Sequence, residues 1–166
     1  LFNGGAFVLA ADGTAVADIP GTNRRIGINY IDRDYAIGAL HEGRSSVGRP
    51  VLSRDLEEPV VALASPIRDS QGRIIGAIVG VINLGLSSFL DHVTEKSYGR
   101  TGSYLIISPK YRQIVTTLDK RRNLEELPPA GANPAIDRFL DGHEGSGVVV
   151  NPRGEEALAS AKHIPS

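Results

Sequence analysis

The chain has 166 residues, of which 41% are hydrophobic and 22% are charged, and its formal net charge is −1. These values describe a folded globular protein of one ordinary domain or two small ones, and they exclude a disordered chain. The near-neutral charge gives no reason to expect nucleic acid or an anionic membrane surface as a partner. The absence of cysteine excludes disulfides, thiolate nucleophiles and zinc–sulfur sites.

Neither a membrane span nor a targeting segment is visible in the sequence. The longest apolar run, residues 74–84, is interrupted by Gly76 and Gly80 and is about half of the ~20 residues that a spanning helix needs. No segment resembles a signal peptide. The chain begins in strand-like sequence and contains no methionine, so we expect it to be an excised part of a longer protein.

The first predicted element is a β-hairpin. Residues 7–10 and 14–19 read as its strands, and they flank Asp12-Gly13. This pair suits a type I′ turn, because glycine accepts positive φ. The basic pair Arg24-Arg25 follows in turn-like sequence, so we expect it to lie in a solvated loop, as we do for residues 120–122.

A short helix is predicted next, over residues 33–41. Asp32 is expected to cap its N-terminus and Gly43 to end it. Its apolar face is expected to consist of Tyr35, Ala36, Ala39 and Leu40.

Three strands are predicted after this helix. Residues 47–52 form a short one, which Pro50 places near a sheet edge. Residues 59–67 and 73–84 form two longer strands, joined by a turn at 68–72. The strand over residues 73–84 is almost entirely aliphatic, so we expect it to be central in its sheet and covered on both faces.

An amphipathic helix is predicted over residues 86–97, as the connector to the second half. Leu86, Phe89, Leu90 and Val93 repeat there at i, i+3, i+4 and i+7.

The second half is predicted to contain a hairpin, a helix and two strands. The hairpin consists of residues 104–108 and 113–118. Asn133 and Pro134 suit the N-cap and first turn of a helix that runs through Leu140 and ends at Gly142. The final strands are residues 148–150 and 157–161, with a turn at 151–154.

The two halves share a sequence pattern. Ile31-Asp32-Arg33 leads to His41-Glu42-Gly43, and Ile136-Asp137-Arg138 leads to His143-Glu144-Gly145. Each stretch follows a predicted hairpin, which indicates one supersecondary unit used twice. We therefore predict an α/β (α+β) protein of two tandem modules, residues 1–85 and 86–166, of which the second lacks a last strand.

Several segments resemble a double Cache domain. In the first half these are Asp32-Arg33-Asp34-Tyr35, residues 47–51 and residues 65–76. In the second half, residues 98–104 and the helix opened by Asn133-Pro134 resemble the membrane-proximal module. Residues 162–165 are similar to the segment that precedes the final strand of the family.

This resemblance implies a PAS-like, periplasmic (extracytoplasmic) sensor of a bacterial inner-membrane receptor. Such receptors are homodimers whose cytoplasmic output is a diguanylate cyclase, a histidine kinase or a chemotaxis signalling region. The membrane-distal module holds a small-molecule ligand, and membrane contact is made only through flanking transmembrane helices. A long N-terminal helix and a final strand typical of the family are missing here. No catalytic residue, cofactor or metal is implied.

Arg33 is the first candidate ligand residue, because a guanidinium grips a carboxylate through two parallel hydrogen bonds. Tyr35 offers a ring wall and a hydroxyl, and the weaker candidates are Tyr30, Ser65 and Asp69. The amino-acid-binding branch of the family uses an aspartate on the last distal strand, whereas residues 79–83 contain none. The resemblance therefore favours an organic acid or another small anion over an amino acid.

Other interpretations stay open at this point. Arg33 can instead form a structural ion pair with Asp55 or Glu57, Tyr30 can be a core residue, and Asp69 can be a turn residue. The chain can be a module for dimerisation or partner contact that binds no ligand. A small α/β hydrolase is less favoured, because the sequence has no Gly-x-Ser-x-Gly elbow, no His-Glu-x-x-His pair and no Gly-rich phosphate loop.

Overall fold

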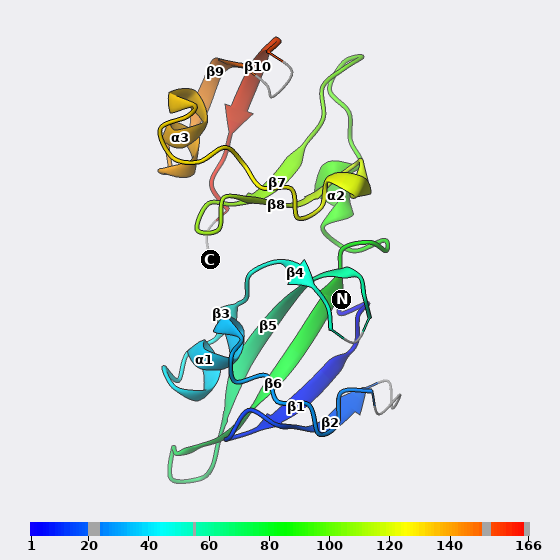
Figure 1. Cartoon of the computed structure of the whole chain (residues 1–166), viewed down its shortest axis with the longest axis vertical. Helices are drawn as coiled ribbons and strands as arrows, with labels where there is room; N and C mark the ends of the chain where they lie inside the picture. Colours follow the sequence, from blue (N-terminus) through cyan, green and yellow to red (C-terminus); the bar gives the residue numbers. More distant parts are fainter. Residues whose placement is uncertain (20–23, 55, 151–153, 165–166) are drawn as a thin grey trace. The chain divides into compact units, whose positions relative to one another are not determined.

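The computed structural model describes residues 1–19, 24–54, 56–150 and 154–164 (Figure 1). It divides into two compact units, which we call the first unit (residues 1–106 and 115–124) and the second unit (residues 107–114 and 125–166). The predicted division at residue 85 stays a prediction. Within the described residues, no helix is long and apolar enough to cross a membrane.

The first unit is built on an antiparallel sheet with the strand order β2-β1-β6-β5-β3, and β4 also pairs with β5. The strands are β1 (Ala6–Ala10), β2 (Ala15–Ile19), β3 (Ser46–Val47), β4 (Val51–Leu52), β5 (Pro59–Arg68) and β6 (Ile74–Asn83). The predicted α+β class is confirmed. The predicted strand at residues 47–52 is split into β3 and β4, both of which pair only with β5, in keeping with the edge position expected from Pro50.

The hairpin of β1 and β2 is present, but its turn is not of the predicted type. A type I′ turn needs positive φ at both central residues, whereas of Asp12 and Gly13 only Gly13 has one, at 86°. Asp12 Oδ1 accepts a hydrogen bond from the Thr14 amide at 2.9 Å. This local bond favours an Asx-type turn over the type I′ conformation.

Strand β6 is central, as predicted, but its covering is uneven. Ala77, Val79 and Val81 belong to the main hydrophobic core on one face. On the other face the ring of Phe2 covers Gly80, because a Cβ at Gly80 would lie 2.5 Å from that ring. Ile78 is 52% exposed, so the prediction that β6 is covered on both faces is wrong for part of its length.

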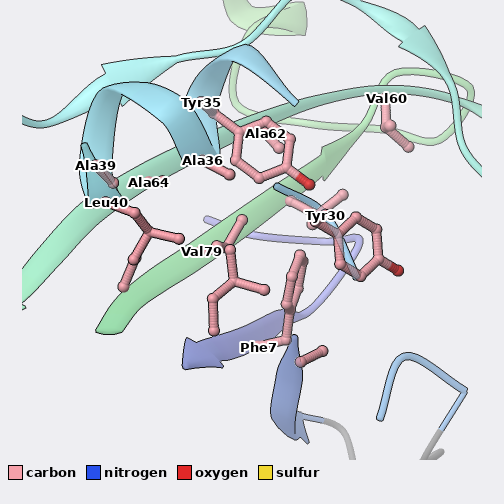
Figure 2. Close-up of a cluster of buried hydrophobic side chains, with 14 residues drawn as sticks. Phe7, Tyr30, Tyr35, Ala36, Ala39, Leu40, Val60, Ala62, Ala64 and Val79 are labelled. Atoms are coloured by element: carbon pink, nitrogen blue, oxygen red, sulfur yellow. The ribbon is translucent and has the colours of Figure 1, made fainter. Parts of the chain in front are cut away.

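Helix α1 (Asp34–Leu40) lies on the core face of this sheet, against β5 and β6 (Figure 1). Its predicted apolar face is buried, and Figure 2 shows it packed over Phe7 and Val79. The predicted cap is wrong: Arg33 occupies the N-cap without a side-chain cap bond. Asp32 instead pairs with Arg54, which is 22 residues away and therefore invisible to local capping rules.

The predicted connector helix is much shorter than expected, since α2 spans only Asp91–Thr94. Leu86, Phe89 and Val93 remain 44–54% exposed, so the expected apolar stripe has little to pack against. Leu90 alone of the four packs against a second cluster, formed by Val61, Ile82 and Leu84. Apolar burial, which supplies most helix stability, is therefore missing at three of the four predicted apolar positions.

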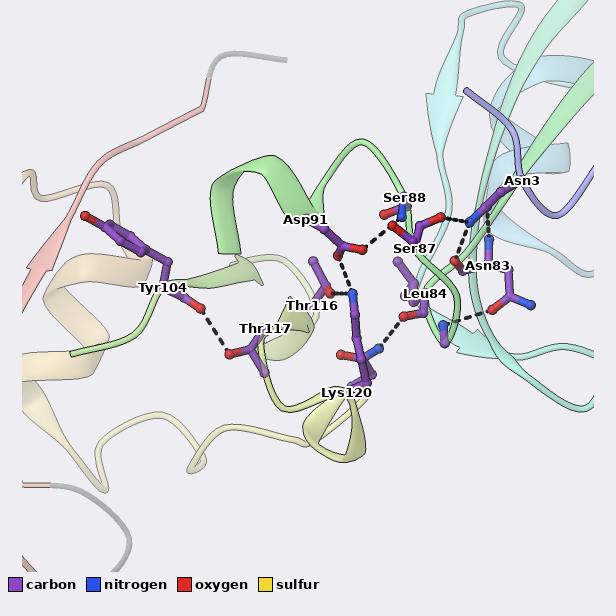
Figure 3. Close-up of polar contacts among 12 residues, drawn as sticks. Asn3, Asn83, Leu84, Ser87, Ser88, Asp91, Tyr104, Thr116, Thr117 and Lys120 are labelled. Carbon is purple, nitrogen blue, oxygen red and sulfur yellow. Dashed lines mark hydrogen bonds and ion pairs between the residues drawn. The ribbon is translucent and has the colours of Figure 1, made fainter. Parts of the chain in front are cut away.

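Polar contacts hold this segment instead (Figure 3). Asp91 accepts hydrogen bonds from the Ser88 amide and from Lys120, and Lys120 also donates to Thr116 Oγ1 at 2.9 Å. The backbone amide of Asn123 donates to the Lys120 carbonyl at 3.1 Å, and the side-chain Nδ2 of Asn123 donates to the Leu84 carbonyl at 2.8 Å. The hydrogen bonds around Lys120 therefore extend to the residue that directly follows β6. The prediction that residues 120–122 form a solvated loop is wrong for Lys120.

Strands β7 (Leu105–Ser108) and β8 (Gln113–Thr117) form a ribbon through which the border between the units runs, and the 3-10 helix η1 (Lys120–Arg122) follows. The second unit also contains α3 (Pro134–Leu140), β9 (Gly145–Val150) and β10 (Glu156–Ala161), with β9 and β10 paired. Asn133 Oδ1 accepts the Ile136 amide at the start of α3, and Pro134 opens the helix, as predicted. The predicted turn at 151–154 lies mostly outside the described residues.

The repeated triplets occupy different positions in their helices. Asp32 and Arg33 precede α1, whereas Asp137 and Arg138 lie inside α3. The sequence match therefore marks a similar order of elements rather than equivalent residues.

Candidate functional site

The first unit contains a cavity of about 30 Å³ between α1, the core face of the sheet and the segment that includes β4. Aromatic rings, aliphatic side chains, one serine and four arginines line it: Phe7, Arg25, Tyr30, Arg33, Tyr35, Arg49, Val51, Ser53, Arg54, Val60, Ala62 and Val81. Three of the five predicted ligand residues, Arg33, Tyr35 and Tyr30, thus meet at one place.

The aromatic side of the cavity consists of packed, buried rings. The rings of Phe7 and Tyr30 lie 5.0 Å apart between centroids at an interplanar angle of 42°, a tilted arrangement typical of favourable aromatic pairs. Both rings and that of Tyr35 are buried in the main core. Figure 2 shows all three on the core face of the sheet, so Tyr30 is a core residue that also lines the cavity.

Arg25 is buried and fixed beside this aromatic wall. Its Nη1 donates to Asp18 Oδ1 at 3.0 Å, its Nη2 donates to the Gly4 carbonyl at 2.8 Å, and its guanidinium lies 5.2 Å from the centroid of the Phe7 ring. The expectation of a solvated loop is therefore wrong for Arg25. Asp18 is the residue from which the burial of Arg25 could have been predicted. It is paired with Phe7 across β1 and β2, so it faces the core. A carboxylate on a core face requires a cation nearby.

Arg49 reaches the cavity through a close contact between its segment and the start of α1. Both carboxylate oxygens of Asp34 accept the Arg49 amide, at 3.2 and 3.0 Å, and Oδ1 also accepts the Tyr35 amide. A Cβ at Gly48 would lie 2.7 Å from Tyr35 Cδ1, so only glycine passes here without displacing the ring. Sequence patterns gave no signal for this contact, because its partners are 15 residues apart.

Arg54 and Asp32 form an ion pair at the rim, with Arg54 Nη2 2.7 Å from Asp32 Oδ2. The hydrogen bond from Arg54, together with the positive charges of Arg54 and Arg33, lowers the pKa of Asp32 below its usual value, against a smaller opposing effect of burial.

Arg33 itself is half-buried, and its guanidinium has no ion pair with any carboxylate that the structure describes. Its predicted alternative partner Glu57 is therefore not paired with it. The other alternative, Asp55, lies outside the described residues.

The remaining two candidates lie elsewhere. Ser65 follows the core residue Ala64 on β5, so it lies on the opposite face of the sheet, where its Oγ is 3.0 Å from Ser45 Oγ. Asp69 lies in the turn between β5 and β6, where its carboxylate accepts the amides of Gln71 and Arg73.

The chemistry of the cavity is that of an anion site. Four guanidiniums and two tyrosines line it, and among the described residues no carboxylate does. At about 30 Å³ it has room for little more than a water molecule, so an organic acid can enter only if groups at the rim move. Across the described residues, no three His, Cys, Asp or Glu side chains gather in a way that could hold a metal ion.

Comparison with known families gives one match, to the family model described as a Cache domain, over residues 3–166. No curated protein matches the chain.

Several solved structures resemble the chain. The ligand-binding domain of the Pseudomonas aeruginosa amino acid chemoreceptor PctB, in complex with L-Arg, is 19% identical with a TM-score of 0.68, over 94% of this chain and 62% of that one. The domain of the Pseudomonas fluorescens chemoreceptor CtaA with L-serine is 15% identical with a TM-score of 0.65, over 93% and 63%. The domain of P. aeruginosa PctC with GABA is 21% identical with a TM-score of 0.64, over 88% and 61%. The chain thus spans less than two thirds of each of these domains, and the likeness concerns the fold.

Proposed function

Because the chain belongs to the Cache domain family, we propose that it is the extracytoplasmic sensing region of a bacterial signal-transduction receptor. Its ligand is a small molecule that carries a carboxylate, and the site is the cavity of the first unit. Arg33 binds that carboxylate, with Tyr35 and Tyr30 as the wall against which the rest of the ligand lies. Ligand binding is relayed across the membrane to a cytoplasmic output domain in a homodimeric receptor.

The arginine-rich cavity is the observation that carries this proposal. Arginine binds carboxylates through two parallel hydrogen bonds, and such charge-assisted bonds are strong where water is scarce. Arg25 and Arg54 already have carboxylate partners. Arg33 lines the cavity and has no ion-pair partner in the described part of the chain, so it is the arginine that we assign to the ligand.

An organic acid fits the cavity better than a free amino acid. The ammonium of an amino acid needs an acceptor such as a carboxylate. Among the described residues no carboxylate lines the cavity, and the one at its rim, Asp32, is already paired with Arg54. Amino acids remain the second candidate, because similar domains are solved with L-Arg and L-serine. A ligand-free module for dimerisation is the rival from a different class.

A thermal-shift screen with organic acids, amino acids, polyamines and purines tests the proposal. A ligand that binds only the folded protein raises the unfolding midpoint in a dose-dependent way. Organic acids are expected to do so for the wild type and to lose the effect in Arg33→Ala. Arg100→Ala is the matched control, because Arg100 is exposed and does not line the cavity. The absence of any stabilising compound for the folded wild type would favour the ligand-free module.

A further inference from the structure

A carboxylate of the protein itself already lies against one of the cavity arginines, Arg54. Asp32 Oδ2 is 2.7 Å from Arg54 Nη2, and Asp32 Oδ1 is 3.5 Å from Arg54 Nη1. Asp32 also directly precedes Arg33 in the chain, and Arg33 is a second arginine that lines the cavity. Its position relative to these cations is the one that an anionic ligand would seek.

The groups around the cavity differ in how firmly they are held. Arg25 is buried and donates hydrogen bonds to Asp18 and to the Gly4 carbonyl, and Phe7 and Tyr35 belong to the core. The side chains of Arg54 and Asp32, in contrast, are 47% and 56% exposed. An exposed ion pair contributes little to stability, because water solvates both charges once they separate. This pair is therefore a contact at the rim that can open at little cost when the cavity widens.

We propose that Asp32 is a built-in competitor of the ligand: its carboxylate occupies Arg54 in the unliganded site, and a carboxylate of the ligand, either the one that Arg33 binds or a second one, replaces it there. This inference rests on the proposed function, since it assumes that a carboxylate enters this cavity. The exchange leaves Arg54 paired with one carboxylate before and after binding, while Asp32 is released to solvent. The ligand binds with full affinity only to molecules in which Arg54 has separated from Asp32. The apparent affinity therefore equals the full affinity multiplied by the fraction of such molecules.

The competition also makes the site selective in a specific way. A negatively charged ligand must displace Asp32 from Arg54 and is repelled by its charge. A neutral ligand of the same shape meets no such repulsion and, as a weaker acceptor for Arg54, does not replace the carboxylate there. Removing the charge of Asp32 is therefore expected to strengthen binding of anions and to leave neutral analogues unaffected.

Isothermal titration calorimetry with malonate, succinate and the neutral diamide of succinate tests this inference. The variants are Asp32→Asn and the charge-matched control Glu57→Gln. Glu57 is also exposed, and it pairs with none of the cavity arginines in the described structure. We expect Asp32→Asn to bind the dicarboxylates about two- to sixfold more tightly than the wild type, because an exposed ion pair of ordinary strength leaves that fraction of Arg54 unpaired. Glu57→Gln should bind like the wild type.

A second background shows whether the gain passes through Arg54. Asp32→Asn added to Arg54→Ala should bring no gain, because the guanidinium for which the two carboxylates compete is gone. The unfolding midpoint of each variant shows that it is folded. The same gain in the Arg54→Ala background would overturn the inference, and so would an equal gain in Glu57→Gln, because either would assign the effect to net charge alone.

The outcomes separate this inference from the proposed function. Dicarboxylate binding by the wild type, with equal or weaker binding by Asp32→Asn, overturns the role of Asp32 and leaves the anion site in place. Binding by Asp32→Asn alone supports the inference in its strongest form. No binding of either dicarboxylate by the wild type, Asp32→Asn or Glu57→Gln overturns the inference and also counts against an organic acid as the ligand.

Discussion

Replacing Asp18 with alanine tests whether the buried ion pair beside the cavity holds the first unit together. The side chains of Arg25 and Asp18 are only 6% and 1% exposed, and their charged atoms lie 3.0 Å apart. Removing the carboxylate leaves a guanidinium buried without its counter-charge. Breaking a buried pair in this way costs about 3–5 kcal/mol, because the remaining charge has lost its water as well as its partner.

The loss is expected in the free energy of unfolding and in the thermal midpoint. For a chain of this length, about 3–5 kcal/mol corresponds to a fall of roughly 6–20 °C. Urea denaturation of the wild type and Asp18→Ala measures the free energy, and a melting curve measures the midpoint. The matched control is Glu42→Ala, which removes the exposed Arg44–Glu42 pair and should cost less than about 1 kcal/mol.

A combined variant distinguishes loss of the charge partner from loss of packing. In an Arg25→Met background no buried cation remains, so Asp18→Ala should cost much less there than in the wild type. A loss for Asp18→Ala no larger than that for Glu42→Ala would refute the reasoning. An equal loss in both backgrounds would refute it too, since it would assign the effect to the cavity left by Asp18.

Two further predictions concern a close contact and a carboxylate of the second unit. Gly48→Ala places a Cβ 2.7 Å from Tyr35 Cδ1, so it should lower the free energy of unfolding measured in urea by about 1–3 kcal/mol. The control is Gly147→Ala, whose Cβ meets nothing nearer than 3.9 Å and which should leave that free energy nearly unchanged. Equal losses in the two variants would contradict the prediction. The hydrogen bond from the Gly131 amide and the bond and charge of Arg112 lower the pKa of Asp137. A lowered pKa stabilises the fold above the unfolded value of about 3.9 and ceases to do so as the pH falls through the folded value. The wild type should therefore be more stable than Asp137→Asn at pH 7, and urea midpoints measured down to pH 3 should show this gap closing; a gap independent of pH would contradict the assignment.

The sequence by itself determined the order of the elements, because the signals involved are local. Alternation and aliphatic content located β5 and β6, and the turn between them holds Asp69 as expected. Asn133 and Pro134 located the start of α3, since a cap bond spans only three residues. The sequence predicts Arg33 and Tyr35 as site residues from the chemistry of a guanidinium beside a phenol ring, in a segment that resembles a known family. The structure brings both, together with the weaker candidate Tyr30, to one cavity.

The tertiary structure decided which charges meet. Asp32 was expected to cap α1, yet Arg54, 22 residues further on, is its partner. Arg25 was expected in solvent and is buried against Asp18, which strand pairing turns towards the core. Local sequence rules cannot predict these ion pairs, because such rules describe a residue only by its neighbours in the chain. An ion pair depends instead on which side chains the packed sheet brings within a few ångströms of each other.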